Sequence, residues 1–337
     1  MVSKEFIRAM PKVELHVHLE GSIQPATLLA LAKRNGVSLP ATSVEGLKEW
    51  YQYRDFPHFV EIYVAISQCL KTAEDIELVM REFLTGQAAQ NIRHSEVTYT
   101  ASTIEKYSQI SWPDQRAALE RATEYGRTQL GVSCGIIVDI VRGDSPERSL
   151  EVARWVVEAK GSSVVALGLA GEERFGSEPY RAAYDLVHDA GIPIAAHSGE
   201  TMGPDSVREV LNVVRPERIG HGVRAIESPS LVRELASSRI PVEVCPSSNV
   251  CLGVYPSLEA HPLSQMLDAG INVSINSDDP PMFGTSLTEE MIKCCDEFGF
   301  NEDILWSLTV NAAQAAFLSG DERRTLLANL REAMPSR

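Results

Sequence analysis

The sequence predicts an α/β protein, a (β/α)8 TIM barrel with extra helices inserted after the first strand, and two observations lead to this fold class. Apolar, β-branched segments such as 135–140 suit parallel strands buried on both faces. Segments of helical periodicity separate them along the chain. The expected strands number eight and span residues 12–18, 92–99, 133–140, 163–169, 192–197, 218–221, 240–245 and 271–276.

The segments between the strands carry the helices. Periodicity predicts helices over 149–160 and 228–237, and Gly or Pro marks many element boundaries. Residues 25–90 contain helical patterns but no clear strand, so we expect an insertion that covers the mouth of the barrel. A doubly wound open sheet is the rival architecture, but no G-x-G-x-x-G supports it. No linker-like stretch interrupts the chain, so we expect a single domain over 1–337.

Composition limits the classes of partner. The chain has 337 residues and a formal net charge of −15, which repels phosphate backbones and anionic lipid. A neutral small molecule fits better than nucleic acid or a membrane. No apolar run approaches the roughly 20 residues that span a bilayer, and the N-terminus lacks a signal-peptide pattern. We therefore expect a cytoplasmic protein; monomer and homo-oligomer both remain open.

Polar residues gather at the ends of four expected strands. His16 and His18 share one face of the first strand, because strand side chains alternate. His197 ends the fifth strand and Glu200 follows it. His221 lies between two glycines at the end of the sixth strand.

Asp278 and Asp279 follow the eighth strand. Ideal alternation would point them to opposite faces, although a strand end can redirect them.

Each of these clusters has an ordinary structural explanation, such as a hydrogen-bonded core histidine or a solvated Asp-Pro turn. Their joint placement is harder to explain that way. All four lie at the C-terminal ends of expected barrel strands, where catalytic residues of this fold are found. Three histidines and an aspartate also make a suitable zinc site. Surface or packing roles are expected for the remaining histidines, His58, His94, His188 and His261.

These motifs resemble the adenosine deaminase family of the amidohydrolase superfamily. The resemblance covers nearly the whole chain, in the family's order. The matching stretches are PKVELHVHLEGS at 11–22, LAGEE at 169–173, HSGE at 197–200, RIGHG at 218–222, EVCPSSN at 243–249 and NSDDP at 276–280.

The resemblance implies one zinc ion per chain, bound by His16, His18, His197 and Asp278. Bound zinc lowers the pKa of its water to about 7, which supplies hydroxide at neutral pH. The expected fourth strand, 164–171, contains no lysine of the kind that bridges two metals in many relatives, so a single metal is expected.

The resemblance also implies the remaining site residues. Glu200 would carry the proton to purine N1, and His221 would orient and polarise the attacking water. Asp279 would contact that water or purine N7. The backbone amide of Gly171 would meet N3.

The implied function is zinc-dependent hydrolytic deamination of a 6-aminopurine nucleoside, with adenosine, which yields inosine and ammonia, as the expected substrate. Glu20 departs from the family's usual aspartate, which meets the ribose 5′-hydroxyl, and would crowd that end of the pocket. Adenine deaminases also carry glutamate there, although residues 276–287 look less like that group. The stretch 55–63 is similar to relatives that act on 5′-modified nucleosides such as 6-aminodeoxyfutalosine.

Two further readings are a non-catalytic purine-binding homologue and a metal hydrolase of amides or esters. The intact Glu200, His221 and four ligands argue against the first. The N1-donor glutamate and the LAGEE stretch argue against the second.

Overall fold

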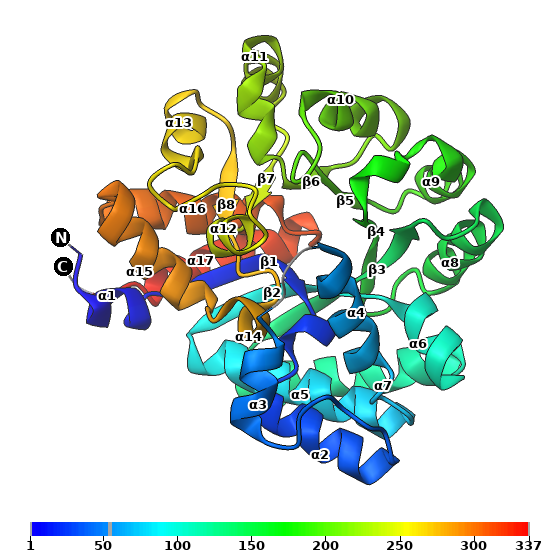
Figure 1. Cartoon of the computed structure of the whole chain (residues 1–337). Coiled ribbons are helices and arrows are strands. Elements are labelled where there is room, and N and C mark those ends of the chain that lie inside the picture. The colour runs from blue at the N-terminus through cyan, green and yellow to red at the C-terminus, as the bar shows by residue number, and fades with distance from the viewer. Residues whose placement is uncertain (1, 53–55, 336–337) are drawn as a thin grey trace.

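The computed structural model describes residues 2–52 and 56–335. Its eight parallel strands follow one another in chain order around a single sheet (Figure 1). This arrangement confirms the predicted α/β barrel. The strands are β1 (Lys12–His18), β2 (Ile92–Tyr99), β3 (Ser133–Arg142), β4 (Val164–Gly171), β5 (Ile194–Ser198), β6 (Arg218–His221), β7 (Val242–Val244) and β8 (Val273–Ile275).

The segment after β8 joins the sheet back to β1. Asp278 forms a parallel bridge with Val17. The N–H of His18 donates to the carbonyl of Asp278 at 2.9 Å, and the N–H of Asp278 donates to the carbonyl of His16 at 3.1 Å. These bonds fix the backbone of β1 beside that of Asp278.

The expected strand positions agree with the structure, but β7 and β8 are shorter than expected. Apolar pattern locates buried residues, whereas strand bounds depend on pairing with both neighbours. After β7 the chain turns into α12 (Pro246–Cys251), because Pro246 opens a helix and cannot donate to a ladder.

Helices surround the barrel on the outside. The predicted helix 149–160 corresponds to α8, which begins earlier because Ser145 caps it and accepts from the N–H of Arg148. These helices are α5 (Ala73–Ala89), α7 (Trp112–Tyr125), α8 (Pro146–Glu158), α9 (Arg181–Asp189), α10 (Pro204–Val213), α11 (Pro229–Ser238), α13 (Leu263–Asp268), α15 (Leu287–Phe298) and α16 (Glu302–Ala315).

The predicted insertion after the first strand is present. It contains α2 (Pro25–Asn35), α3 (Val44–Trp50) and α4 (Phe56–Ser67), all before α5. Phe59 and Tyr63 of α4 line the pocket at the C-terminal ends of the strands. The insertion therefore covers the mouth of the barrel.

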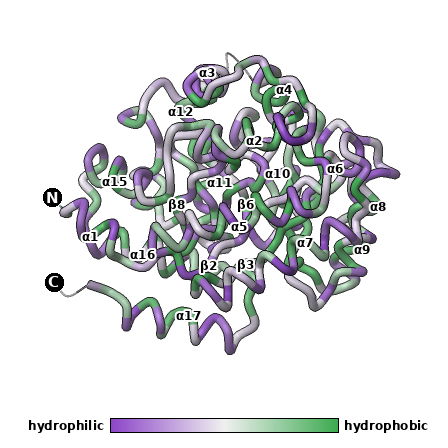
Figure 2. Tube along the Cα trace, turned by 90° about the horizontal axis from the view of Figure 1, so that it is seen from below, coloured by the Kyte–Doolittle hydropathy of each residue, from purple (hydrophilic) through white to green (hydrophobic). Residues whose placement is uncertain are grey.

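The opposite end of the barrel is covered by the C-terminal helix α17 (Gly320–Glu332). Figure 2 shows α17 on the side of the molecule away from α3 and α4. Leu326 and Leu330 of α17 belong to one apolar cluster with Val13 and Leu15 of β1. Among the described helices, none has the length and apolarity that crossing a membrane requires.

Candidate active site

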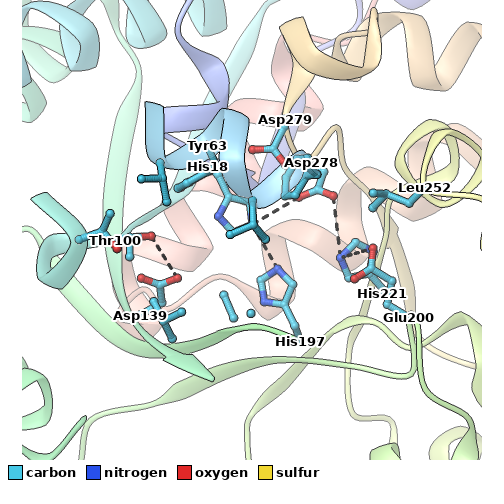
Figure 3. A pocket seen from close by; sticks show the side chains of 17 residues that line it. His18, Tyr63, Thr100, Asp139, His197, Glu200, His221, Leu252, Asp278 and Asp279 are labelled. Atoms are coloured by element: carbon cyan, nitrogen blue, oxygen red, sulfur yellow. Dashed lines mark hydrogen bonds and ion pairs between the residues drawn. The ribbon is translucent and has the colours of Figure 1, made fainter. Parts of the chain in front are cut away.

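Four polar side chains that the sequence predicts as metal ligands lie close together at the mouth of the barrel, and Figure 3 shows three of them, His18, His197 and Asp278. The Nε2 atoms of His16 and His18 lie 3.5 Å and 3.3 Å from Oδ1 of Asp278. Nε2 of His18 also lies 3.1 Å from Nε2 of His197. Strands β1 and β5 and the segment after β8, which are far apart in the sequence, thus contribute to one cluster.

The backbone at Asp278 explains how two adjacent aspartates reach the same site. Asp278 has a φ of +64°, in the left-handed region that few residues other than glycine adopt. This conformation ends the strand alternation and turns the carboxylate into the mouth. His221 has a φ of +60°. Backbone strain of this kind, typically about 1–3 kcal/mol per residue, is concentrated at functional sites.

The histidine nitrogens are set up to bind a cation. Nδ1 of His16 donates to the carboxylate of Glu243 at 3.0 Å, and Nδ1 of His197 donates to the carbonyl of Leu169 at 2.8 Å. Each ring therefore keeps Nε2 as the atom with a free lone pair. Nε2 of His16 is buried and has no hydrogen-bond partner. These donors fit a divalent metal ion.

Charge in the cluster supports the same conclusion. Burial lowers the pKa of His16, but the carboxylates of Asp278 and Glu243 outweigh it and raise the pKa to about 10. The position therefore favours positive charge, which a bound cation can supply.

Geometry also brings His221 close to the ligand set. One donor atom each from His16, His197, His221 and Asp278 all lie within 4.8 Å of one another. This group has His221 where the predicted set has His18. The two sets share His16, His197 and Asp278.

Glu200 is buried beside His221. Its Oε1 has no hydrogen-bond partner and lies 3.6 Å from Nε2 of His221. Burial raises the pKa of Glu200 well above its ordinary value, and Asp278 and Glu173 raise it further. A carboxyl group that keeps its proton near neutral pH can act as a general acid.

Glu173 holds the loop that carries Glu200. Its carboxylate accepts the backbone N–H groups of Gly199, Glu200 and Thr201, each at 2.8 Å, and the hydroxyl of Ser206 at 2.6 Å. Sequence reasoning missed this role, although Glu173 lies within the LAGEE stretch.

Asp279 lines the same pocket, and its Oδ1 is buried without a hydrogen-bond partner. Burial and then the neighbouring Asp278 raise the pKa of Asp279 well above its ordinary value. A Cβ at position 21 would lie 1.5 Å from this Oδ1, so Gly21 is required for Asp279 to occupy its place. The residue therefore offers a polar atom to the pocket.

The pocket at the mouth of the barrel is lined by Gly171 but not by Glu20. Glu20 is fully buried, and its carboxylate accepts from the hydroxyl of Tyr63 at 2.9 Å and the N–H of Thr100 at 3.0 Å. It therefore acts on the pocket through Tyr63. Sequence reasoning missed Asp139, which lines the pocket with Oδ1 buried and unpaired.

The sequence model of the adenosine deaminase family matches residues 11–333. The chain belongs to this family. Adenine deaminase of Agrobacterium fabrum is 36% identical over 96% of this chain and 98% of its own length. Aminodeoxyfutalosine deaminase of Streptomyces coelicolor is 36% identical over 93% of this chain and 81% of its own length. The crystal structure of an adenine deaminase from Arthrobacter aurescens is 31% identical, with a TM-score of 0.91 over 96% of this chain and 99% of that one.

Membership of the adenosine deaminase family makes this chain a hydrolytic deaminase of the amidohydrolase superfamily. The motifs that carried the resemblance all lie within the matched residues 11–333.

Proposed function

We propose that this chain is a zinc-dependent deaminase that converts adenine and water to hypoxanthine and ammonia. The observation that carries the reaction type is the buried Glu200 carboxyl beside the cluster of metal-binding side chains. The choice of adenine rests on similarity to proteins named adenine deaminase, which extends over 96% of the chain.

We assign one zinc ion to His16, His18, His197 and Asp278. Three imidazole nitrogens and a carboxylate oxygen make a donor set that zinc commonly takes in catalytic sites. Zinc bound there would lower the pKa of a water molecule, so that hydroxide is available to attack carbon near neutral pH. Glu243 and the Leu169 carbonyl keep His16 and His197 in the ring orientation that binding needs.

The chain's own residues would handle the proton and the purine. Glu200 would give its proton to N1, so that the ring accepts electron density as water adds to C6. The proton that the water releases would pass to the amino nitrogen, and the bond between C6 and that nitrogen would break as ammonia leaves. The proton of the new hydroxyl group would then return to Glu200. His221 and Asp279 would hold the attacking water. The alternative for Asp279 is a contact with purine N7. The N–H of Gly171 would bind N3.

The pocket favours a free base over adenosine, the substrate that sequence motifs alone favour. The carboxylate of Glu20 accepts hydrogen bonds from Tyr63 and Thr100, and no atom of Glu20 is exposed to a ribose 5′-hydroxyl. The unpaired Oδ1 of Asp139 is an acceptor in the pocket wall. Such an atom suits a purine whose N9 carries a hydrogen, which a nucleoside lacks.

A 5′-modified nucleoside such as 6-aminodeoxyfutalosine is the second candidate. It rests on the 36% identity to a protein named aminodeoxyfutalosine deaminase. The stretch 55–63, which is similar to relatives with such substrates, begins outside the described residues at position 55. Its remaining residues form the start of α4, where Phe59 and Tyr63 line the pocket.

The proposal is tested by kcat/KM for adenine, adenosine, a 5′-modified adenosine and 6-aminodeoxyfutalosine. Loss of purine absorbance and release of ammonia would be followed together. We expect kcat/KM for adenine to exceed that for each nucleoside at least about tenfold, because a nucleoside has no N9–H to donate to the Asp139 carboxylate. A higher value for 6-aminodeoxyfutalosine would favour the second candidate, and turnover of none would favour a non-catalytic purine-binding protein.

The single domain over 1–337, the cytoplasmic location and the absence of nucleic-acid and membrane partners stay predictions from the sequence.

A further inference from the structure

A chain of three hydrogen bonds leads from a backbone amide to His221. The N–H of Leu263 meets Nδ1 of His261 at 3.2 Å. Nε2 of His261 lies 3.1 Å from Oδ1 of Asn249, and Nδ2 of Asn249 lies 3.2 Å from Nδ1 of His221. All three side chains are buried, with exposed fractions of 3%, 0% and 1% for His261, Asn249 and His221.

The backbone amide of Leu263, at one end of this series, determines which group donates in each of the three hydrogen bonds. A backbone N–H only donates, so Nδ1 of His261 must accept and carries no proton. The single N–H of the neutral ring is then on Nε2, and it donates to the Asn249 carbonyl oxygen. The amide group of Asn249 must therefore present its NH2 to His221.

The same logic determines the proton on His221. Because Nδ1 accepts from Asn249, the proton of the neutral ring lies on Nε2. Nε2 is the atom that points to the reaction centre, 3.6 Å from Oε1 of Glu200 and 3.9 Å from Oδ2 of Asp278. A protonated ring nitrogen has no lone pair for a metal.

We propose that Asn249 and His261 are positioning residues that hold His221 as the Nε2–H tautomer. In this form His221 donates a hydrogen bond to the attacking oxygen and is neither a metal ligand nor a base. The role in water attack rests on the proposed deaminase function, whereas the tautomer rests on the hydrogen bonds alone. This proposal also favours His18 over His221 as the fourth ligand.

The surroundings of His261 keep this arrangement in place. The ring of His261 packs against Tyr255 and Phe298, with centroids 5.2 Å and 6.5 Å away. The two neighbours restrict ring rotation, which would break the bond to Leu263. The donor and acceptor order of the three hydrogen bonds is therefore determined at Leu263 and His261, away from the pocket.

The test is a long-range ¹H–¹⁵N correlation spectrum of zinc-loaded protein with ¹⁵N-labelled histidine, with His221 assigned by comparison with His221→Gln. We expect Nε2 of His221 to be protonated and Nδ1 to be unprotonated. A proton on Nδ1 of His221 in the wild type would overturn the proposal. The spectrum needs no substrate, so this result does not depend on whether the protein deaminates adenine.

The Asn249→Asp variant tests the same bond, because the side chain keeps its shape but its carboxylate can only accept a hydrogen bond from His221. The proton should move to Nδ1 of His221, while the signals of His188, which bonds to the Val214 carbonyl, should stay unchanged. We expect kcat for the best purine substrate to fall about 100-fold, with KM changed far less.

Asn249→Leu removes the bond without reversing it, and it separates the tautomer from simple packing. If the tautomer matters, Asn249→Asp should lose more turnover than Asn249→Leu despite being closer in shape. The reverse order, or an Asn249→Asp variant with wild-type kcat, would overturn the positioning role.

Discussion

The carboxylate of Glu173 accepts a hydrogen bond from the backbone N–H of Glu200 at 2.8 Å. The amides on either side of Glu200, those of Gly199 and Thr201, bond to the same carboxylate. Three successive amides on one carboxylate fix the turn after β5. They therefore set the direction in which the Glu200 side chain leaves the backbone.

Replacing Glu173 with Gln should displace this turn, because a side-chain NH2 would face backbone N–H groups. We expect kcat to fall about 10- to 100-fold with little change in KM, since small misplacement of a catalytic group carries costs of this size. Glu172→Gln is the control: Glu172 is partly exposed and pairs with Arg174. Equal kcat values for the two variants would show that the turn does not need Glu173.

Glu243 should control metal affinity through His16. It accepts the Nδ1–H of His16 and also pairs with the buried Arg218. We expect Glu243→Gln to weaken zinc binding about 10- to 100-fold, measured by competition with a chelator. Glu96→Gln is the matched control, because Glu96 pairs with Arg218 but does not bond to His16. If Glu243→Gln and Glu96→Gln weaken zinc binding equally, the loss of affinity comes from the ion pairs with Arg218 and not from the hydrogen bond to His16.

Stability should fall on the acid side because of His261. Burial lowers its pKa from 6.5 to about 4. Between these values the unfolded chain binds more protons than the folded one, so the free energy of unfolding decreases as pH falls. The loss from pH 7 to pH 5 should be about 2 kcal/mol for this group.

Urea unfolding of wild type and His261→Gln at both pH values would measure this loss, since the zinc ligands are common to both proteins. The variant lacks the titrating group, so its stability should fall less between the two pH values. Parallel losses in both proteins would contradict the assignment.

Asp139 should bind substrate through its unpaired oxygen. Asp139→Ala removes the acceptor, and we expect KM for adenine to rise about tenfold, which corresponds to about 1.4 kcal/mol. Thr103→Ala, at another position that lines the pocket, is the control. Steady-state kinetics on both variants would decide, and an unchanged KM in Asp139→Ala would remove Asp139 from the substrate contacts.

The sequence predicts the barrel, and the proximity of the proposed ligands, for a physical reason. Buried parallel strands leave long apolar runs, and the fold then places every strand end at one mouth, so His16, His197 and Asp278 converge without further information. Strand bounds were less predictable, because β7 and β8 depend on pairing with neighbours.

The supporting residues could not be predicted in the same way. Glu173, Asn249 and His261 act through hydrogen bonds to residues that are adjacent only after folding. His261 was expected to have only a surface or packing role, and no local pattern connects it to His221. The left-handed backbone of Asp278 likewise arises from its bonds to β1.

Zinc titration of metal-free protein, with adenine deamination measured at each step, tests the central claim most directly. We predict that activity rises linearly and stops at one zinc per chain. Glu200→Gln should bind the same single zinc but turn over about 10²- to 10⁴-fold more slowly, since it cannot donate a proton to N1. Activity that requires two metals per chain, or near wild-type turnover by Glu200→Gln, would contradict the account.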